Sequence, residues 1–154
     1  MTDVTLLRQL RRDEGLRLTA YPDPRSPRAK TGKGSGAPWT IGYGHTGPEV
    51  REGLQWTKAQ AEAALEADVE RHNAELAARF PWVARLPPAR RRVLQNMAFN
   101  MGVEKLAKFH ATLAAAKAGD WATAAHQMQQ SAWYGQVGSR AVRLVETMRT
   151  GIDM

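Results

Sequence analysis

The chain has 154 residues, a length typical of one domain, of which 43% are hydrophobic and 24% are charged. This composition excludes a chain that is disordered throughout, and no apolar run approaches the roughly 20 residues that a membrane-spanning helix needs. Cysteine is absent, which excludes a disulfide framework, a thiolate metal site and a cysteine nucleophile. The net charge of +7 favours an anionic partner, such as nucleic acid, outer-membrane lipid or a cell-wall polymer.

The first predicted element is an amphipathic helix over residues 5–13, where leucines recur at helical spacing and arginines occupy the other face. Gly15 ends the pattern. Asp13 and Glu14 therefore come at the C-terminal end of the helix, where the helix dipole disfavours negative charge. Acidic residues at a position that costs stability are candidates for a functional role.

Residues 21–48 are rich in proline and glycine and are not expected to sustain a helix. The β-forming residues at 39–43 predict a small antiparallel hairpin or a three-stranded sheet across about residues 17–48. Between residues 25 and 36, basic side chains alternate with proline, serine and glycine, which predicts an exposed, mobile loop.

The rest of the chain is predicted to be helical. A capping box, Thr57-Lys-Ala-Gln60, begins a helix that runs to about Arg79. Pro87-Pro88 starts the next helix, which Gly102 ends and whose apolar positions form the centre of the core. Three shorter helices are expected over residues 109–118, 120–130 and 140–149.

Glu14 and Asp23 are a candidate catalytic pair at the passage from helix to strand. Glycoside hydrolysis needs two carboxyl groups, one that protonates the leaving oxygen and one that stabilises positive charge or activates water. The spacing by itself does not identify such an enzyme, because this chain has 15 acidic residues and such pairs arise by chance.

Longer motifs narrow the interpretation. Glu14-Gly15, Tyr21-Pro22-Asp23 and Thr-Ile-Gly-Tyr-Gly-His-Thr at 40–46 together resemble the phage-type (T4-like) lysozyme and endolysin family, and the resemblance continues in family order at 95–102, 109–113 and 133–151. It implies an α+β, mainly α, two-lobed fold forming one catalytic domain over 1–154. The expected parts are a β-sheet lobe at 15–56, a connecting helix at 57–80, and a helical lobe at 81–154 that includes the N-terminal helix, without a separate wall-binding domain.

The resemblance also implies an activity. Such proteins are muramidases that cut the β-1,4 bond between N-acetylmuramic acid and N-acetylglucosamine in peptidoglycan, and an endolysin uses this activity to lyse its host. Glu14 would be the general acid, with a pKa raised by a non-polar wall. Asp23 and Thr40 would hold the attacking water, and Arg140 would pair with Glu14 from the last helix.

The chain departs from the family pattern between the second carboxylate and the threonine. The usual interval is six residues, but here it is 40 − 23 = 17, so 17 − 6 = 11 extra residues lie within the 24–38 segment. Thr40 still takes the threonine role, because Ile-Gly-Tyr-Gly-His follows it directly. Thr31 and Thr46 are poorer candidates.

The resemblance implies saccharide-binding positions on both lobes. These are Thr46 on the β lobe, and Phe99, Asn100, Thr112 and Gln127 on the helical lobe. His45 matches a histidine whose role in the family is structural. The four histidines show no His-Glu-x-x-His spacing, and neither a metal nor another cofactor is expected.

Three alternatives remain open for the function. One is a lytic transglycosylase on the same bond, which needs only a single glutamate. A second is a basic helical protein that binds nucleic acid through the cluster Arg85, Arg90, Arg91 and Arg92, although no recognition motif supports it. A membrane-perturbing role of the basic C-terminal segment is a further rival.

The expected partner is peptidoglycan, with anionic outer-membrane lipid as a second candidate, and the protein is expected to be a monomer that does not bind nucleic acid. The N-terminal residues lack a secretory apolar core. We therefore expect synthesis in the host cytoplasm and release through a holin to the periplasmic wall.

Overall fold

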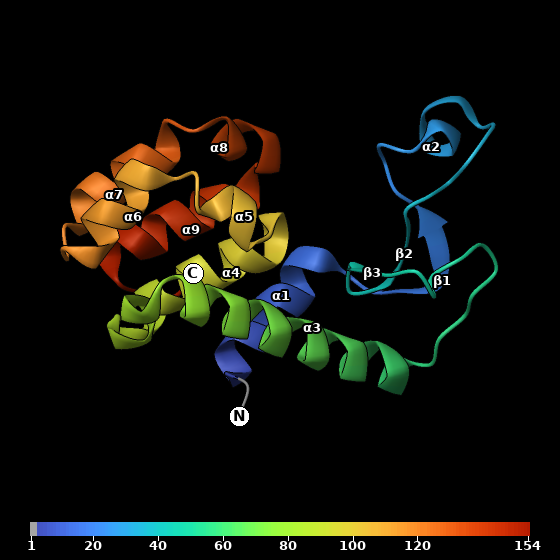
Figure 1. Cartoon of the computed structure of the whole chain (residues 1–154), viewed down its shortest axis with the longest axis horizontal. Coiled ribbons are helices and arrows are strands. Elements are labelled where there is room, and N and C mark those ends of the chain that lie inside the picture. The colour runs from blue at the N-terminus through green and yellow to red at the C-terminus, as the bar shows by residue number, and fades with distance from the viewer. Residues whose placement is uncertain (1–2) are drawn as a thin grey trace. The chain divides into compact units, whose positions relative to one another are not determined.

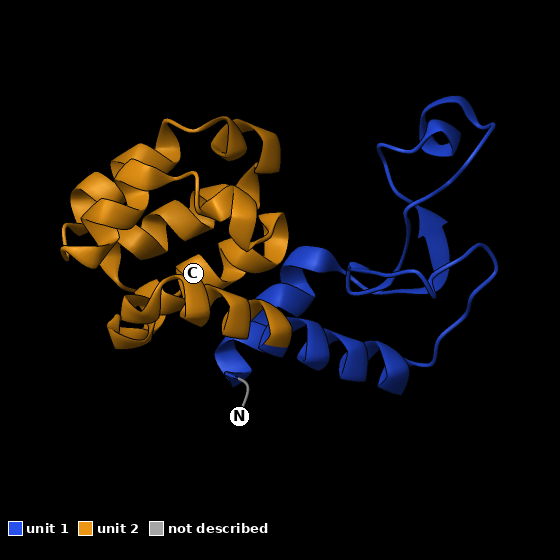
Figure 2. Ribbon diagram, in the orientation of Figure 1, with its two compact units in different colours: residues 1–70 blue, residues 71–154 orange. Residues whose placement is uncertain are grey.

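The computed structural model describes residues 3–154, which form a mainly helical chain with one small antiparallel sheet (Figure 1). The predicted α+β class, mainly α, is confirmed. The chain divides into two compact units, residues 1–70 and residues 71–154 (Figure 2). Within residues 3–154, no helix is both long and apolar enough to cross a membrane.

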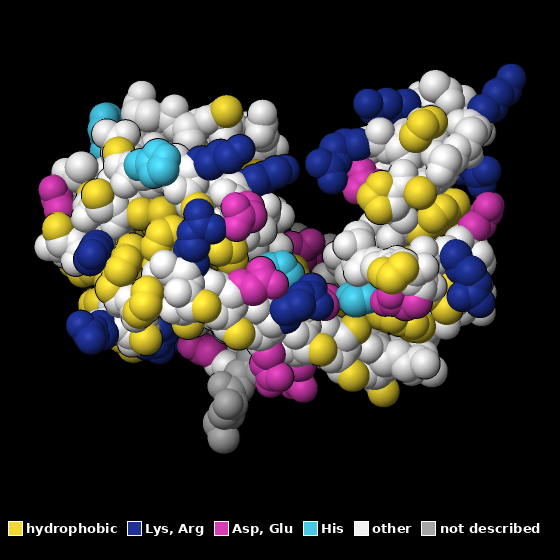
Figure 3. Space-filling view, viewed as in Figure 1, with side chains coloured by type: hydrophobic (Ala, Val, Ile, Leu, Met, Phe, Trp, Pro, Cys, Tyr) yellow, Lys and Arg dark blue, Asp and Glu magenta, His cyan; other side chains and the backbone are white. Residues whose placement is uncertain are grey.

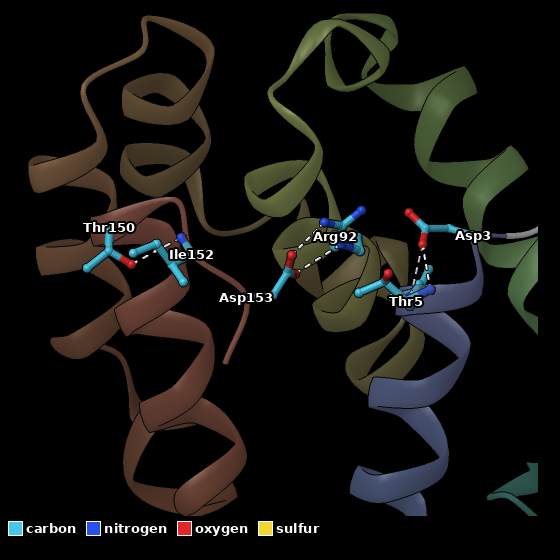
Figure 4. A network of polar contacts seen from close by, with 7 residues as sticks. Asp3, Thr5, Arg92, Thr150, Ile152 and Asp153 are labelled. Carbon is cyan, nitrogen blue, oxygen red and sulfur yellow. Dashed lines mark hydrogen bonds and ion pairs between the residues drawn. The ribbon is translucent and has the colours of Figure 1, made fainter.

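Helix α1, Val4–Glu14, opens the described chain. Asp3 caps it, because its Oδ1 accepts hydrogen bonds from the backbone nitrogens of Thr5 at 2.9 Å and Leu6 at 3.1 Å (Figure 4). The helix buries its leucine face, and Gly15 ends it with a φ of 69°. The predicted N-terminal helix is therefore confirmed, and Glu14 is its last residue.

The sheet consists of β1 (Arg17–Pro22), β2 (Trp39–Gly42) and β3 (His45–Thr46), antiparallel and in that order, as predicted. A later segment runs beside β1, where Ala20 N donates to Leu54 O at 2.9 Å and Trp56 N donates to Leu18 O at 2.8 Å. One face of the sheet covers a small core of Ala20, Ile41 and Val50, against which Trp39, Leu54 and Trp56 pack.

The segment between β1 and β2 contains a helix, α2 (Pro27–Thr31), where the sequence predicted only a loop. That prediction was wrong, because five residues need only one turn, which Ser26 caps and Pro27 starts. Arg28 donates through Nε to Gly34 O at 2.9 Å and through Nη1 to Glu52 at 2.8 Å. The segment is thus tied to itself and to the rest of the unit.

Helix α3, Lys58–Arg79, follows the predicted capping box. Thr57 N donates to Gln60 Oε1 at 2.8 Å, and Gln60 N donates to Thr57 Oγ1 at 3.2 Å. Both reciprocal bonds satisfy donors that the first helical turn leaves open. The prediction of a long helix beginning here is confirmed.

All the regular elements of the second unit are helices. After the end of α3 it contains η1 (Pro81–Arg85), α4 (Pro88–Met101), α5 (Val103–Leu106), α6 (His110–Lys117), α7 (Trp121–Gln129), α8 (Ala132–Val137) and α9 (Ser139–Thr150). The four longer helices α4, α6, α7 and α9 were predicted, whereas the short elements η1, α5 and α8 were not.

Helix α9 packs against α4, α7 and α8, and buried residues from these elements form the core of the unit. Of the five predicted core positions of α4, Val93, Leu94, Met97 and Ala98 are buried, whereas Met101, the last residue of the helix, is only partly buried. The residues after α9 are held to α4, because Arg92 binds Asp153 through Nε at 3.0 Å and Nη2 at 2.6 Å (Figure 4).

Candidate active site

Glu14 lies at the end of α1, and its carboxylate is close to the turn between β2 and β3. Gly44 in that turn has a φ of 76°, and a Cβ placed on it would lie 2.8 Å from Glu14 Oε2. Only glycine fits this position without strain and without displacing the carboxylate. The Gly-Tyr-Gly motif of the sequence therefore provides the space that Glu14 occupies.

Asp23 directly follows β1 and is largely buried. Its backbone nitrogen donates to Pro38 O at 3.1 Å, so the pairing of β1 with the chain before β2 extends to this residue. Its Oδ1 accepts from Arg25 N at 2.7 Å and from Arg25 Nε at 3.2 Å. The hydrogen bond from the Arg25 side chain lowers the pKa of Asp23 although burial opposes it, so Asp23 is a carboxylate at neutral pH.

Thr40 is buried in the middle strand β2. It lies opposite Tyr21 of β1 and Thr46 of β3, so these three side chains share one face of the sheet. Asp23 follows β1 directly, and its backbone bond to Pro38 continues the pairing one residue beyond Pro22 and Trp39. The backbone of Asp23 is therefore paired two residues before Thr40, although residues 24–38 lie between Asp23 and β2 in the sequence.

Tyr21 is a site residue to which the sequence assigned no role. Burial raises the pKa of its phenol, and the charges of Glu14 and Asp23 raise it further, whereas Arg17, 4.5 Å from the ring centroid, lowers it. Tyr21 is therefore a neutral phenol within electrostatic reach of both carboxylates. The Tyr-Pro-Asp motif includes this residue, but the sequence did not indicate that its phenol would lie near both carboxylates.

His45 in β3 has a structural role, in agreement with its prediction. Its Nδ1 lies 2.7 Å from Asp68 Oδ2, its Nε2 lies 2.6 Å from Glu49 Oε1, and its ring packs on Trp56. The hydrogen bond to Asp68 raises the pKa of His45 most, and Glu49 adds to the effect against burial. Among residues 3–154, no group of three His, Cys, Asp or Glu side chains is placed to hold a metal ion.

Arg140 is the second residue of α9 in the second unit and is buried. Its Nε donates to Oδ1 of Asn96, a fully buried residue of α4, at 2.9 Å. The sequence did not identify Asn96 as a partner, although Asn96 lies within the 95–102 motif. The ion pair between Arg140 and Glu14 stays a prediction.

A pocket of about 320 Å³ in the second unit brings together two of the predicted saccharide-binding residues, Thr112 and Gln127. Phe109, His110 and Gln130 also line it. An aromatic ring beside amide and hydroxyl groups suits an N-acetyl sugar, which has an apolar face and paired polar groups.

The other predicted saccharide-binding residues lie elsewhere. Asn100 is outside that pocket's lining and accepts a hydrogen bond from Trp133 Nε1 at 2.9 Å, while Trp133 packs edge-on against Phe109. Phe99 packs against His72. Thr46 is exposed on β3 in the first unit. Their contacts with a glycan stay predictions.

The phage lysozyme family model matches residues 11–148. The chain belongs to the phage lysozyme family. This match confirms the resemblance that the motifs predicted, and it covers both units with nearly all of the described elements.

Two known proteins are similar to this chain in sequence. It is 32% identical, over 173 aligned residues and 97% of its own length, to the pre-baseplate central spike protein Gp5 of Enterobacteria phage T4, of which it covers 28%. It is 34% identical over 62 residues to the probable T4-type lysozyme 2 of Dictyostelium discoideum, which covers 40% of this chain and 36% of that relative. The chain thus spans about a third or less of the length of these relatives.

Proposed function

We propose that this chain is a muramidase that hydrolyses the β-1,4 bond between N-acetylmuramic acid and N-acetylglucosamine in peptidoglycan. The observation that carries this proposal is the arrangement in the first unit, where Glu14 lies against Gly44 and the backbone of Asp23 is paired with Pro38, two residues before Thr40. Membership of the phage lysozyme family supports it. Peptidoglycan is the proposed partner, and the reaction requires no cofactor.

In the proposed reaction, Glu14 donates a proton to the glycosidic oxygen as the bond between that oxygen and the anomeric carbon breaks. Asp23 and the hydroxyl of Thr40 hold a water molecule that attacks the anomeric carbon, and the carboxylate of Asp23 accepts the proton that the water loses. The attack from the opposite side of the ring inverts the configuration at that carbon. Arg140 is proposed to orient Glu14.

The saccharide contacts are part of the same proposal. Thr112 and Gln127 would bind N-acetyl groups in the pocket of the second unit. Thr46, Phe99 and Asn100 are proposed as further contacts with the glycan. Trp133 would support Phe109 in that pocket, because Asn100 fixes its indole nitrogen.

Mass spectrometry of digested, purified sacculi tests the reaction. Hydrolysis leaves reducing-end N-acetylmuramic acid, and in water enriched in oxygen-18 the label enters that product. A 1,6-anhydro product without label would show a lytic transglycosylase instead. The absence of both products, from a protein that is folded, would contradict both activities.

The biological setting is a separate part of the proposal. We propose an endolysin that reaches the periplasmic wall through a holin and lyses the host. The 32% identity to a central spike protein over 97% of the chain favours a second candidate, a wall-cutting enzyme used at entry. Expression in a host with and without a holin separates them, because an endolysin lyses the cells only when the holin is present and its loss prevents phage release rather than phage entry.

One feature of the second unit weighs against the nucleic-acid alternative. Arg90 donates to Met148 O at 2.8 Å and to Arg149 O at 3.1 Å, and Arg92 binds Asp153. These two arginines of the basic cluster therefore bind the C-terminal end of α9 and the residues after it. Both guanidinium groups stabilise the fold, which leaves them less available for phosphate groups.

A further inference from the structure

Arg25 lies in the segment 24–38, which is longer in this chain than the family pattern requires, and it contacts the second carboxylate of the candidate site. Arg25 binds Asp23 with both its backbone nitrogen and its guanidinium group. The Asp23 side chain is 12% exposed, whereas that of Arg25 is 78% exposed. The carboxylate is thus covered on one side by an arginine that itself faces solvent.

The two oxygens of Asp23 have different surroundings. Oδ1 accepts from Arg25 N at 2.7 Å and from Arg25 Nε at 3.2 Å. Oδ2 has a single contact among the described residues, the more distant Nη2 of Arg25 at 3.4 Å. Oδ1 is therefore occupied, and Oδ2 is the oxygen that has capacity to accept a hydrogen bond from water.

The backbone around Asp23 is also fixed. Its nitrogen donates to Gly36 O at 3.3 Å as well as to Pro38 O, and its carbonyl oxygen accepts from Ser26 N at 2.8 Å. Further along the segment, Arg28 N donates to Ser35 O at 3.0 Å. These bonds close the inserted segment on itself, so Arg25 is presented to the carboxylate from a short, hydrogen-bonded turn.

We propose that Arg25 is a positioning residue that acts through Asp23, holding Oδ1 so that Oδ2 receives the water. This inference rests on the proposed hydrolytic function and extends it to a residue of the insertion. Arg25 also lowers the pKa of Asp23, which favours the ionised state that a general base requires. Of the other titratable groups, the phenol of Tyr21 on β1 interacts electrostatically with Asp23, and the guanidinium of Arg28 is bound to Glu52.

The pH profile of kcat/KM on purified sacculi tests the proposal with Arg25→Ala, Arg25→Lys and a control, Lys30→Ala. Lys30→Ala removes the same charge from the same segment, at an exposed position on α2. The backbone bond to Asp23 persists in all three variants. In Arg25→Ala we expect the acidic limb to move to higher pH by roughly half a unit, the effect of an exposed ion pair. Arg25→Lys should restore part of the shift, and Lys30→Ala should leave the limb unchanged.

A double-mutant cycle separates action through Asp23 from direct contact with the glycan. In an Asp23→Ala background, Arg25→Ala should cause no further loss of rate. An equal loss in both backgrounds would overturn the proposal and indicate that Arg25 contacts the wall directly. An acidic limb that moves equally in Lys30→Ala and Arg25→Ala would overturn it too, since the effect would then come from net charge.

A measurement without catalysis separates this inference from the proposed function. The NMR titration of the Asp23 carboxyl carbon should give a higher pKa in Arg25→Ala than in the wild-type protein. If the wild-type protein releases no reducing ends from sacculi, the proposed function fails, whatever the titration gives. If it is active but the titration of Asp23 is the same in both proteins, only the role of Arg25 fails.

Discussion

Glu14 is the residue on which the proposed chemistry depends most. We expect Glu14→Gln to fold normally, because the amide preserves the shape, but to lose roughly 10²- to 10⁴-fold in rate, since it cannot donate the proton. Glu75→Gln, an exposed substitution on α3, is the control of equal charge change. Release of reducing ends and the thermal midpoint measure activity and folding. A Glu14→Gln variant with more than about a tenth of the wild-type rate would be incompatible with a general acid.

Gly44 has a geometric role in the site that can be tested, because it leaves space for the carboxylate of Glu14. A Cβ at this position would meet Glu14 Oε2 at 2.8 Å, so Gly44→Ala should displace the carboxylate and reduce the rate by about a hundredfold. Gly53→Ala is a matched control, because Gly53 has a similar φ of 86° and nothing lies within 4 Å of its added Cβ. Both variants should lose about 1–2 kcal/mol of stability from backbone strain. If Gly44→Ala and Gly53→Ala digest sacculi at equal rates, Gly44 does not determine the position of Glu14.

The residues of the site differ in how far the sequence could predict them. Glu14, Asp23 and Thr40 lie in local motifs, and the pairing of Thr40 with Tyr21 agrees with the assignment of Thr40 across the insertion. Arg25 could not be found in this way, because its contact with Asp23 depends on the turn that the insertion forms. Asn96 was missed for a similar reason, since its contact with Arg140 joins helices 44 positions apart in the chain.

At the scale of elements, long periodic segments were predictable and short ones were not. The capping box of α3, and the Pro87-Pro88 start and apolar spacing of α4, locate these helices from local information. Helix α2 has no buried residue, so no apolar periodicity signals it, and its composition of proline and basic residues is typical of a loop. Elements of one or two turns such as α5 and α8 are stabilised by packing with neighbouring helices, which local sequence does not contain.

His45 links β3 to α3 through Asp68, and this link predicts a pH dependence of stability. The pKa of His45 is raised in the folded state, so its stabilisation is complete below the unfolded pKa of about 6.5 and is lost as pH rises through the folded pKa. The pKa of Glu49 is lowered, so its contribution is present above its unfolded pKa and is lost as pH falls through its folded value. The network should therefore stabilise the fold most in mildly acidic solution.

Denaturant unfolding at a series of pH values measures this effect. Between mildly acidic and mildly alkaline pH, the wild-type protein should lose about 1–2 kcal/mol that His45→Gln does not lose, because the glutamine has no charge to give up. His126→Gln, an exposed histidine on α7, is the control and should follow the wild-type curve. If His45→Gln and the wild-type protein show the same pH dependence, the histidine network does not contribute through its charge.

At the scale of the whole molecule, the chain has 22 basic and 15 acidic residues and therefore a net charge of +7. In Figure 3, Lys and Arg side chains occur on the visible face of both units and gather around α2. Several are bound internally, as Arg28 is to Glu52, but their positive charge still contributes to the long-range field. Peptidoglycan carries carboxylates on its stem peptides, so this field should increase the rate at which the protein meets its proposed substrate, the wall.

Salt should therefore slow the digestion of purified sacculi. The Debye length is about 8 Å at physiological ionic strength, so added salt screens attraction between the wall and charges that are not in direct contact. We expect the rate on sacculi to fall between roughly 20 and 300 mM NaCl, whereas the thermal midpoint stays nearly constant over the same range.

A soluble glycan fragment without peptide stems serves as the control substrate, because it lacks the carboxylates that the field attracts, and its cleavage should depend much less on salt. A rate on sacculi as constant as that on the fragment would show that the net charge of +7 has no part in wall capture, and the surplus of arginines would then be explained by internal contacts such as those of Arg90 and Arg92.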